Sequence, residues 1–176
     1  MKRKLFQLSI STPDGRFIAR YSTRGLAELN FPAGGRAGLP VGRDARQRVP
    51  TNVADKIPTQ ILGWHRAVTA GLKSSLAGRK PKNLPPLDLS GGTEFQRRVW
   101  NEMRKISTGR TKSYGEVAQA VGKPKAVRAV GGACGANPIP VLVPCHRVLA
   151  AHGKIGGFGG GLDWKRKLLA REGIKF

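Results

Sequence analysis

Hydrophobic and polar positions interleave near the start of the chain in a way that predicts three short strands. The first two are residues 5–10 (LFQLSI) and 17–21 (FIARY), separated by the turn sequence PDG. A third extended segment covers residues 25–31 (GLAELNF). Short alternating segments joined by tight turns favour strands paired with their neighbours. We therefore expect a small antiparallel meander.

The pattern then changes to helical spacing between residues 57 and 77, and Gly78 follows as a stop signal. The apolar positions of this predicted helix are Ile57, Ile61, Val68, Leu72 and Leu76. Residues 32–56 carry Gly, Pro and Arg with little periodicity, which predicts a long loop. Residues 79–92 predict a linker with at most one short strand.

Helix-start signals are sharper in the second half of the chain. Thr93 is followed three residues later by Gln96, and Ser113 is followed by Glu116. Each pair predicts a capping box, in which the side chain of each residue accepts a hydrogen bond from the backbone N–H group of the other. We expect the first of these helices to end at Gly109. Its apolar stripe consists of Phe95, Val99, Met103 and Ile106.

Two short helices follow one another at residues 113–135. The first stops at Gly122, and Pro124 stands where a first-turn proline opens a helix that runs to about Gly135. Two short helices joined by a tight glycine-containing turn are typical of a DNA-binding helix-turn-helix. An ordinary helical hairpin fits the same pattern equally well.

The second of these helices has few large side chains. Two glycines inside a helix cost roughly 1 kcal/mol each relative to alanine, so we expect compensation from a closely approaching backbone. That backbone belongs either to the protein or to a nucleic acid. Arg128 projects among these residues and is either a groove-reaching side chain or a solvated one. The small residues are Ala126, Ala129, Gly131, Gly132, Ala133 and Gly135.

Charge narrows the choice of partners. The 176 residues include 32 Lys and Arg against 10 Asp and Glu, for a net charge of +22. Each half, divided after residue 90, holds 16 basic and 5 acidic side chains, so the excess is not a basic tail. A field this positive favours a polyanion, most often nucleic acid, although a surface selected for solubility or a basic genome-wide composition also explains it.

Other classes of protein are disfavoured by what the chain lacks. No apolar stretch approaches the roughly 18 residues of a membrane helix, and no apolar run follows the basic N-terminus. Two cysteines without a secretory signal predict free thiols in the cytoplasm, with nucleoid association in a bacterium or archaeon. No pair of Cys or His residues has ligand spacing, so we expect neither a metal nor a cofactor.

The most informative segment is residues 137–148, where three prolines and an apolar triplet lead to Cys145-His146-Arg147. Cysteine is nucleophilic as the thiolate, so it needs a nearby base or a positive field, which His146 and Arg147 offer. Adjacent side chains on a flat strand point to opposite faces. Either the chain bends here or the imidazole acts through a water. The alternative is a buried structural cysteine beside a surface histidine.

Residues 144–148 (PCHRV) closely resemble the O6-alkylguanine-DNA alkyltransferases, and the similarity extends over about residues 84–175. The resemblance implies an α+β fold with two domains. Residues 1–88 would form a small α/β domain with an antiparallel, ribonuclease H-like sheet, and residues 89–176 a mainly helical domain with the helix-turn-helix. The matching segments are GTEFQ at 92–96, Val99-Trp100, Ser113-Tyr114, Arg128 to Gly131, Asn137-Pro138, the glycine loop 156–161, Lys165 and Leu168 to Gly173.

The resemblance also implies a reaction. Cys145, activated by His146 through a water and by Glu172, would attack the alkyl carbon on guanine O6, and Tyr114 would help to neutralise the leaving guanine. Asn137 would brace the turn before the active-site segment. Because the thioether is stable, each molecule would act once. Family members accept O6-alkylguanine, and O4-alkylthymine is expected as a second substrate.

For DNA, the resemblance implies minor-groove binding by a monomer and flipping of the damaged nucleotide, whose place Arg128 would fill. The expected DNA-contacting residues are Arg128, Ala126, Ala129, Gly131, Tyr114 and Thr93. Carbonyls of Cys145 and Val148 would read the exocyclic amine of the base, under a flap at Phe158-Gly159. The expected pocket residues are Val148, Phe158, Gly159, Gly160 and Cys134.

Three departures from the family pattern matter. Phe158 stands where many members carry Tyr, so a hydroxyl is lost while stacking remains. Cys134 adds a second thiol, for which a small buried core position is the alternative interpretation. The N-terminal half has no cysteine, so the structural zinc of some members is not available.

Three other functions compete with alkyl transfer. A lesion-sensing alkyltransferase-like protein lacks the reactive cysteine, and Cys145 argues against it. A general basic nucleic-acid-binding module would leave Cys145 unreactive and Arg128 dispensable. A cysteine hydrolase would need an oxyanion site, for which the sequence carries no signal.

Overall fold

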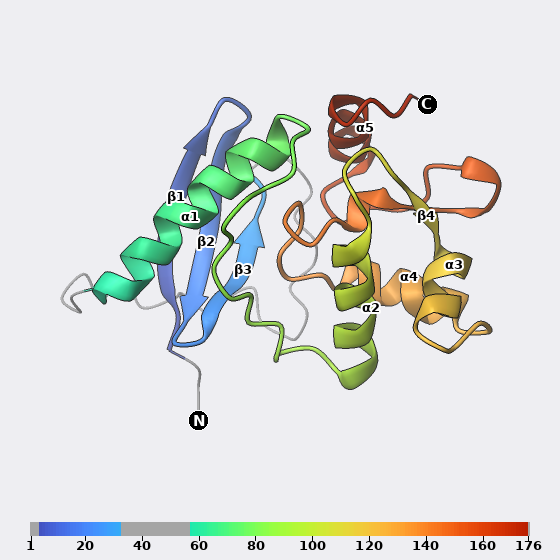
Figure 1. Ribbon diagram of the computed structural model, residues 1–176, viewed down its shortest axis with the longest axis horizontal. Coiled ribbons are helices and arrows are strands. Elements are labelled where there is room, and N and C mark those ends of the chain that lie inside the picture. Colours follow the sequence, from blue (N-terminus) through green and yellow to red (C-terminus); the bar gives the residue numbers. More distant parts are fainter. Residues whose placement is uncertain (1–3, 33–56, 176) are drawn as a thin grey trace.

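The computed structural model describes residues 4–32 and 57–175, and the loop expected at 32–56 lies almost entirely outside this part. Strands β1 (Phe6–Thr12), β2 (Gly15–Ser22) and β3 (Gly25–Asn30) pair in that order as an antiparallel sheet. Helix α1 (Thr59–Leu76) covers one face of the sheet (Figure 1). The predicted meander and the predicted helix are therefore confirmed.

Burial follows the predicted periods in both kinds of element. On β2, Phe17, Ala19 and Tyr21 are buried at every second position, and on α1 the positions at helical spacing are buried. The linker after α1 makes only an isolated bridge, Leu87 to Leu26, as expected for this segment. The alternating pattern was therefore a sound guide, because half of each element faces the core.

The second half of the chain is mainly helical, so the fold is α+β as expected. Its long elements are α2 (Glu94–Lys105), α3 (Tyr114–Ala120), α4 (Val127–Gly135) and α5 (Leu162–Arg171). Short elements connect them: β4 (Lys112–Ser113), η1 (Cys145–Arg147), β5 (Val148–Leu149) and η2 (Ala151–Gly153). Both capping boxes form, at Thr93 and at Ser113. Helix α2 lies between the sheet and the pair α3 and α4 (Figure 1).

Two predicted helix boundaries are wrong. Helix α2 ends at Lys105, so Gly109, with φ +75°, lies in the turn beyond it. Helix α4 begins at Val127, so Pro124 is not in its first turn. The Ala126 N–H donates to the Lys123 carbonyl at 2.8 Å, which closes a tight turn around Pro124. Proline suits the second position of such a turn, because its φ is fixed and its missing N–H is not needed.

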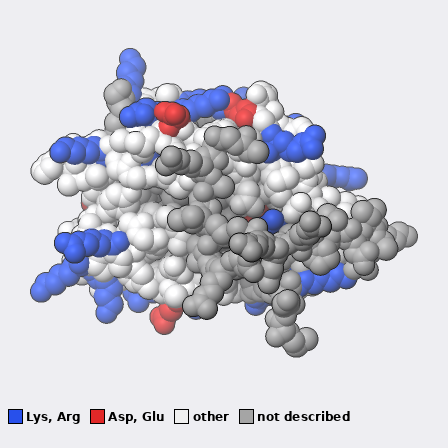
Figure 2. Space-filling view, turned by 180° about the vertical axis from the view of Figure 1, so that it is seen from behind, with Lys and Arg blue, Asp and Glu red and all other residues white. Residues whose placement is uncertain are grey.

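Helix α4 packs against α2 and α3, and its other residues are exposed or half-buried. Trp100 of α2 donates its ring N–H to the Ala133 carbonyl at 2.8 Å, and Val130, Ala133 and Cys134 are buried. The rest of the helix surface faces outward. In residues 4–32 and 57–175 no helix is long and apolar enough to cross a membrane. On the face drawn in Figure 2, Lys and Arg side chains are spread over the described surface and do not gather in one patch.

Candidate active site

The nucleophile candidate Cys145 sits at the start of a tight turn. Directly after Pro144 the chain enters the 3-10 turn η1, so the bend, one of the two alternatives for the adjacent Cys and His, is present. The Cys145 backbone N–H donates to the Val143 carbonyl at 2.8 Å, and only 6% of the residue is exposed. Because of the bend, the two neighbouring side chains do not point to opposite faces as they would on a flat strand.

Asn137 ties this turn together. Its side-chain amide donates to the Val143 carbonyl at 2.7 Å and to the Cys145 sulfur at 3.1 Å. Its side-chain oxygen accepts from the Ile139 N–H at 3.1 Å. The expected bracing residue is therefore also a hydrogen-bond donor to the sulfur, and a donor at this distance favours the thiolate over the thiol.

His146 and Glu172 form a buried pair, with His146 Nε2 3.0 Å from a Glu172 carboxylate oxygen. A carboxylate accepts, so Nε2 carries the proton and Nδ1 is left as an acceptor. Nδ1 is buried and has no hydrogen-bond partner in the part of the chain that the structure describes. An acceptor buried without a partner is uncommon and marks a place for a water or a transferred proton.

The pKa shifts keep the Cys145 thiol and the His146 imidazole neutral before reaction. Burial raises the pKa of the Cys145 thiol, against the lowering effect of the Asn137 hydrogen bond. Burial also lowers the pKa of His146, against the raising effect of Glu172. For Glu172, burial acts to raise the pKa, but the hydrogen bonds from His146 and Arg147 outweigh it and lower the pKa to about 2. Near neutral pH the site therefore holds a thiol, a neutral imidazole and a carboxylate.

Arg147 has a role that the sequence analysis missed. We expected it to add positive potential at Cys145, but its guanidinium turns toward Glu172, with the closest nitrogen 2.8 Å from the carboxylate. The same side chain donates to the Ile106 carbonyl at 2.6 Å and to the Thr108 hydroxyl at 3.1 Å. Arg147 thus binds the carboxylate that orients His146. The position of Arg147 directly after His146 in the sequence does not indicate this contact.

Tyr114 is brought to the site by a parallel pair of short strands. Strand β4, directly before Tyr114, pairs with β5, directly after η1. The Tyr114 hydroxyl donates to the Gly157 carbonyl at 3.4 Å. Burial, together with the negative charges of Cys134 and Cys145, raises the pKa of Tyr114 to about 12. Tyr114 is therefore protonated at neutral pH and available as a donor.

A second residue that we missed is Lys165, which appeared in the sequence analysis only as part of a matching segment. It is fully buried, and its ammonium donates to the Val148 carbonyl at 2.7 Å and to the Gly157 carbonyl at 3.1 Å. Burial lowers its pKa to about 8, although the charges of Cys145 and Cys134 act in the opposite direction. Lys165 joins the Cys145 segment to the glycine loop.

The expected pocket residues have different surroundings in the structure. Gly159 is exposed, and the Phe158 ring lies edge-on to Phe31 with centroids 5.8 Å apart. Gly160 is buried, where a Cβ atom would stand 2.7 Å from the Phe31 ring. The Cys134 sulfur contacts Met103 at 3.4 Å, and burial raises its pKa to about 12. Gly160 and Cys134 therefore both take part in protein packing. For Cys134 this agrees with the alternative interpretation, a small buried core position.

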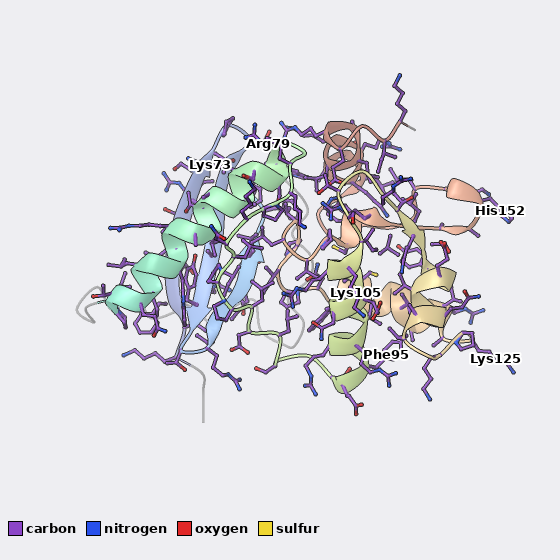
Figure 3. All side chains as sticks on the ribbon, in the orientation of Figure 1. Lys73, Arg79, Phe95, Lys105, Lys125 and His152 are labelled. Carbon is purple, nitrogen blue, oxygen red and sulfur yellow. The ribbon has the colours of Figure 1, made fainter. Side chains whose placement is uncertain are left out.

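The remaining histidine of this region lies away from the site. His152 is at the outer tip of the loop between β5 and α5, pointing away from the molecule (Figure 3). Its backbone has a positive φ of 56°. Of the two histidines in the second half of the chain, His146 is the one next to a cysteine.

The outer face of α4 carries the residues expected to contact DNA. Arg128 and Ala129 are exposed, Ala126 is the N-cap and is half-buried, and Gly131 is half-buried. In the described chain, a Cβ atom added to Gly131, Gly132 or Gly135 would meet nothing within 4 Å. The protein's own backbone therefore does not explain these glycines. Thr93 is exposed at the N-cap of α2, where its hydroxyl accepts from Gln96.

Three comparisons place this arrangement among known proteins. Residues 94–174 match the family model described as 6-O-methylguanine DNA methyltransferase, DNA binding domain. A methylated-DNA–protein-cysteine methyltransferase of Mycolicibacterium paratuberculosis is 59% identical over 86 residues, which are 49% of this chain and 52% of the relative. One of Methanosarcina acetivorans is 55% identical over 82 residues, 47% of this chain and 53% of the relative. These matches span about half the length of the curated relatives.

The similarity to a solved structure covers more of the chain. The crystal structure of Mycobacterium tuberculosis OGT in complex with DNA superimposes with a TM-score of 0.72 at 36% sequence identity. The superposition covers 93% of this chain and 90% of that protein. The N-terminal sheet and α1 are therefore shared as well as the helical half.

Proposed function

The chain belongs to the O6-alkylguanine-DNA alkyltransferase family, the methylated-DNA–protein-cysteine methyltransferases, and on this premise we propose that it repairs DNA by alkyl transfer to itself. The alkyl group of O6-alkylguanine, and also that of O4-alkylthymine, moves to the sulfur of Cys145. One observation carries the proposal: a buried thiol beside an amide donor at 3.1 Å and a neutral imidazole held by a carboxylate at 3.0 Å. This is the environment that an activated cysteine needs.

The reaction follows from these positions. Cys145 gives its proton through a water to Nδ1 of His146, the buried acceptor that has no partner among the described residues, while Glu172 stabilises the imidazolium. The thiolate attacks the alkyl carbon, so an S–C bond forms as the C–O6 bond breaks. Tyr114 donates a hydrogen bond to the leaving base. The thiol proton ends on the guanine, and the protein keeps a stable thioether, so each molecule reacts once.

The pocket is completed by main-chain groups. The Val148 carbonyl already accepts from Lys165, but a carbonyl oxygen has a second lone pair with which to accept from the exocyclic amine of the base. The Cys145 carbonyl acts with it. Phe158 and Gly159 form the flap over the base, and Phe158 is steadied by the ring of Phe31.

The DNA-binding face is the outer side of α4. Its glycines cost helix stability and contact nothing in the described chain, so a partner outside the protein explains them best. A minor groove, with backbone on both sides, needs small residues at the contact. Arg128 makes no hydrogen bond or ion pair with the described residues, and it is exposed in the middle of this face. It fills the space left by the flipped nucleotide.

The organisation of the chain fits this activity. Every group proposed for the reaction comes from one chain, which supports a monomer acting on double-stranded DNA. We place the boundary between the two domains at residues 88 and 89, after the linker that follows α1. The first domain then holds the sheet and α1, and the second holds α2 to α5.

The test is the intact mass of the protein after mixing with a duplex that carries O6-methylguanine, followed by peptide mapping. Alkyl transfer adds the mass of one methylene to the peptide containing Cys145, and the gain saturates at one per molecule. A lesion sensor would bind the damaged duplex more tightly than the undamaged one without any mass gain. A general basic DNA-binding protein would show neither the mass gain nor the preference.

A further inference from the structure

Helix α5 is held by two different parts of the chain. Trp164, Lys167 and Arg171 contact the N-terminal sheet and its first turn. Lys165 and Glu172 contact the active-site segment, and Leu168, on the same side of the helix, is buried. Successive residues are about 100° apart around a helix, so two rows at the same spacing lie on neighbouring faces. One short helix therefore contacts both the sheet and Cys145's surroundings (Figure 1).

The sheet holds the end of α5 through one carboxylate. Asp14, in the β1–β2 turn, accepts two hydrogen bonds from Arg171, at 2.6 and 2.9 Å, and lies 2.7 Å from the Lys167 ammonium. Only 6% of the Asp14 side chain is exposed. The hydrogen bonds from Arg171, followed by the effects of Lys167, lower the pKa of Asp14 to about 2. A two-pronged bond of this kind fixes direction as well as distance.

Asp14 is itself held in place. Its backbone N–H donates to the Thr12 hydroxyl oxygen at 3.2 Å, and that hydroxyl donates to the Gly15 carbonyl at 2.8 Å. Gly15 has a φ of +113°, which the turn requires and other residues rarely adopt. The carboxylate therefore projects from a rigid hairpin turn and not from a loose loop.

A second contact fixes the same point of α5. A Cβ atom placed on Gly78, just after α1, would lie 1.9 Å from the carbonyl oxygen of Arg171. The end of α1 and the end of α5 therefore touch through their backbones. Together with Asp14, this contact leaves little freedom for the last turn of α5.

The next residue along the chain is Glu172. Its carboxylate is 3.0 Å from His146 and 2.8 Å from Arg147, and it accepts from the Gly109 N–H at 3.1 Å. Glu172 is the C-cap of α5, so a rotation or shift of the last turn moves this carboxylate. A group that orients a catalytic base must be held within a fraction of an ångström.

We propose that Asp14 is a positioning residue for the Glu172–His146 pair, so that the N-terminal hairpin maintains the alignment of the base that activates Cys145. This inference rests on the proposed alkyl transfer. It gives the N-terminal half, which lies outside the matched family model, a part in the reaction: the sheet supplies a rigid point against which α5 is aligned.

The test compares Asp14→Asn with the unchanged full-length protein. The single-turnover rate of methyl transfer from an O6-methylguanine duplex is measured from acid to alkaline pH, together with DNA affinity and thermal unfolding. We expect the rate at neutral pH to fall at least about tenfold, because a small displacement of a catalytic group costs this much or more. DNA affinity should not change, since α4 is not touched.

The pH profile distinguishes positioning from a merely structural role. Glu172 raises the pKa of His146, against burial and the charges of Arg147 and Lys165. With Glu172 displaced, the pKa of His146 falls, so the imidazole is a weaker base for the Cys145 proton and becomes neutral at a lower pH. In Asp14→Asn the plateau rate should therefore fall, and the midpoint of the rise in rate with pH should move downward. A change in stability alone lowers the unfolding temperature and leaves that midpoint unchanged.

Two further variants complete the design. Asp163→Asn removes a fully exposed carboxylate from the same helix, whose one ion pair among the described residues is with Arg166 at 3.5 Å, and should leave the rate and the midpoint unchanged. Arg171→Gln breaks the same contact from the other side, and replaces Asp14→Asn if that variant does not fold. In a Glu172→Gln background, Asp14→Asn should cause no further loss, because effects that act through one group are not additive.

The outcomes separate the inference from the proposed function. If the unchanged protein gains no mass at Cys145, the proposed alkyl transfer is wrong, and this inference is wrong with it. If the unchanged protein transfers the methyl group while Asp14→Asn and Arg171→Gln match it in rate and pH midpoint, only the positioning role is overturned. A full additional loss in the Glu172→Gln background also overturns it.

Discussion

Helices α4 and α5 have nearly the same length, nine and ten residues, but their surroundings are opposite. A Cβ atom added to any of the three glycines of α4 would meet nothing within 4 Å in the described chain, and the residues on one side of that helix are exposed. Both the sheet side and the active-site side of α5 are occupied. The open side of α4 supports the proposed DNA contact, whereas the two contacted sides of α5 support the proposed positioning role.

Their arginines show the same contrast. Arg171 of α5 makes two hydrogen bonds to a shielded carboxylate, while Arg128 of α4 has no partner among residues 4–32 and 57–175. Helix α4 packs beside α2 and contributes Cys134 to the core, whereas α5 packs against the η1 turn that contains Cys145. The proposed DNA-binding face and the proposed positioning contact therefore lie on different helices, and variants can separate them.

The largest effect on alkyl transfer is expected for a change at Cys145, in the η1 turn. Cys145→Ser keeps nearly the same volume but replaces the thiol with a far weaker nucleophile, so alkyl transfer should be abolished. DNA affinity should be retained, because the outer face of α4 is unchanged. Intact mass and fluorescence anisotropy with a lesion duplex measure the two properties. Residual mass gain on any other residue would contradict the assignment of the nucleophile.

The next effect tests the α4 side alone. Arg128→Ala should slow transfer from a lesion in duplex DNA by about tenfold or more, because flipping a nucleotide costs a few kcal/mol that the inserted side chain offsets. Transfer from free O6-methylguanine should not change. The matched control is Lys125→Ala, which removes an exposed cation on the turn before α4 (Figure 3) and leaves the flipping role intact. Equal losses with duplex and free base would exclude that role.

The contact of Glu172 at the end of α5 is tested by measuring stability at low pH. The folded pKa of Glu172 is lowered to about 2 from 4.5, so its contribution to stability is complete above pH 4.5 and is lost as the pH falls toward 2. The shift corresponds to about 3 kcal/mol of unfolding free energy. Urea unfolding at a series of pH values measures this loss. Glu172→Gln should be less stable at neutral pH and show a flatter acid dependence; an unchanged slope would contradict the prediction.

The smallest effects should have opposite signs on α4 and at Gly78, which contacts the end of α5. Gly132→Ala on α4 should raise the unfolding free energy by roughly 0.5–1 kcal/mol, because the added methyl meets nothing and the helix gains propensity. Gly78→Ala should lower it by more than about 1 kcal/mol, since φ is +69° and the methyl meets the end of α5. Denaturant unfolding of both variants gives the signs. Two changes of the same sign would remove the contrast drawn between α4 and α5.

Prediction from sequence succeeded where a signal is local. The alternating segments became β1, β2 and β3, the 3.6-residue pattern became α1, and both capping boxes formed with their expected partners. It failed at two boundaries, Gly109 and Pro124. At Pro124 a backbone hydrogen bond between Lys123 and Ala126 closes a turn, and a proline opening a helix looks identical to one inside such a turn.

For the site, the motif indicated which residues matter but not how they are connected. Asn137, His146 and Glu172 were all named, and a bend at Cys145 was one of the two alternatives that strand geometry left open. The direction of the Arg147 guanidinium was not foreseen, and neither was the burial of Lys165. Both depend on carbonyls and carboxylates that are distant in sequence, and no local pattern encodes those.

The sequence by itself determined the strands, the helices, the capping boxes and the Cys-His pair, because each depends on residues at most a few positions apart. Only the tertiary structure decided that Asp14 holds Arg171 across 157 positions and that Glu172 meets His146 across 26. It also decided that the glycines of α4 face away from the rest of the described chain. Such contacts form when the core brings distant segments together, and their strength depends on burial that no single segment specifies.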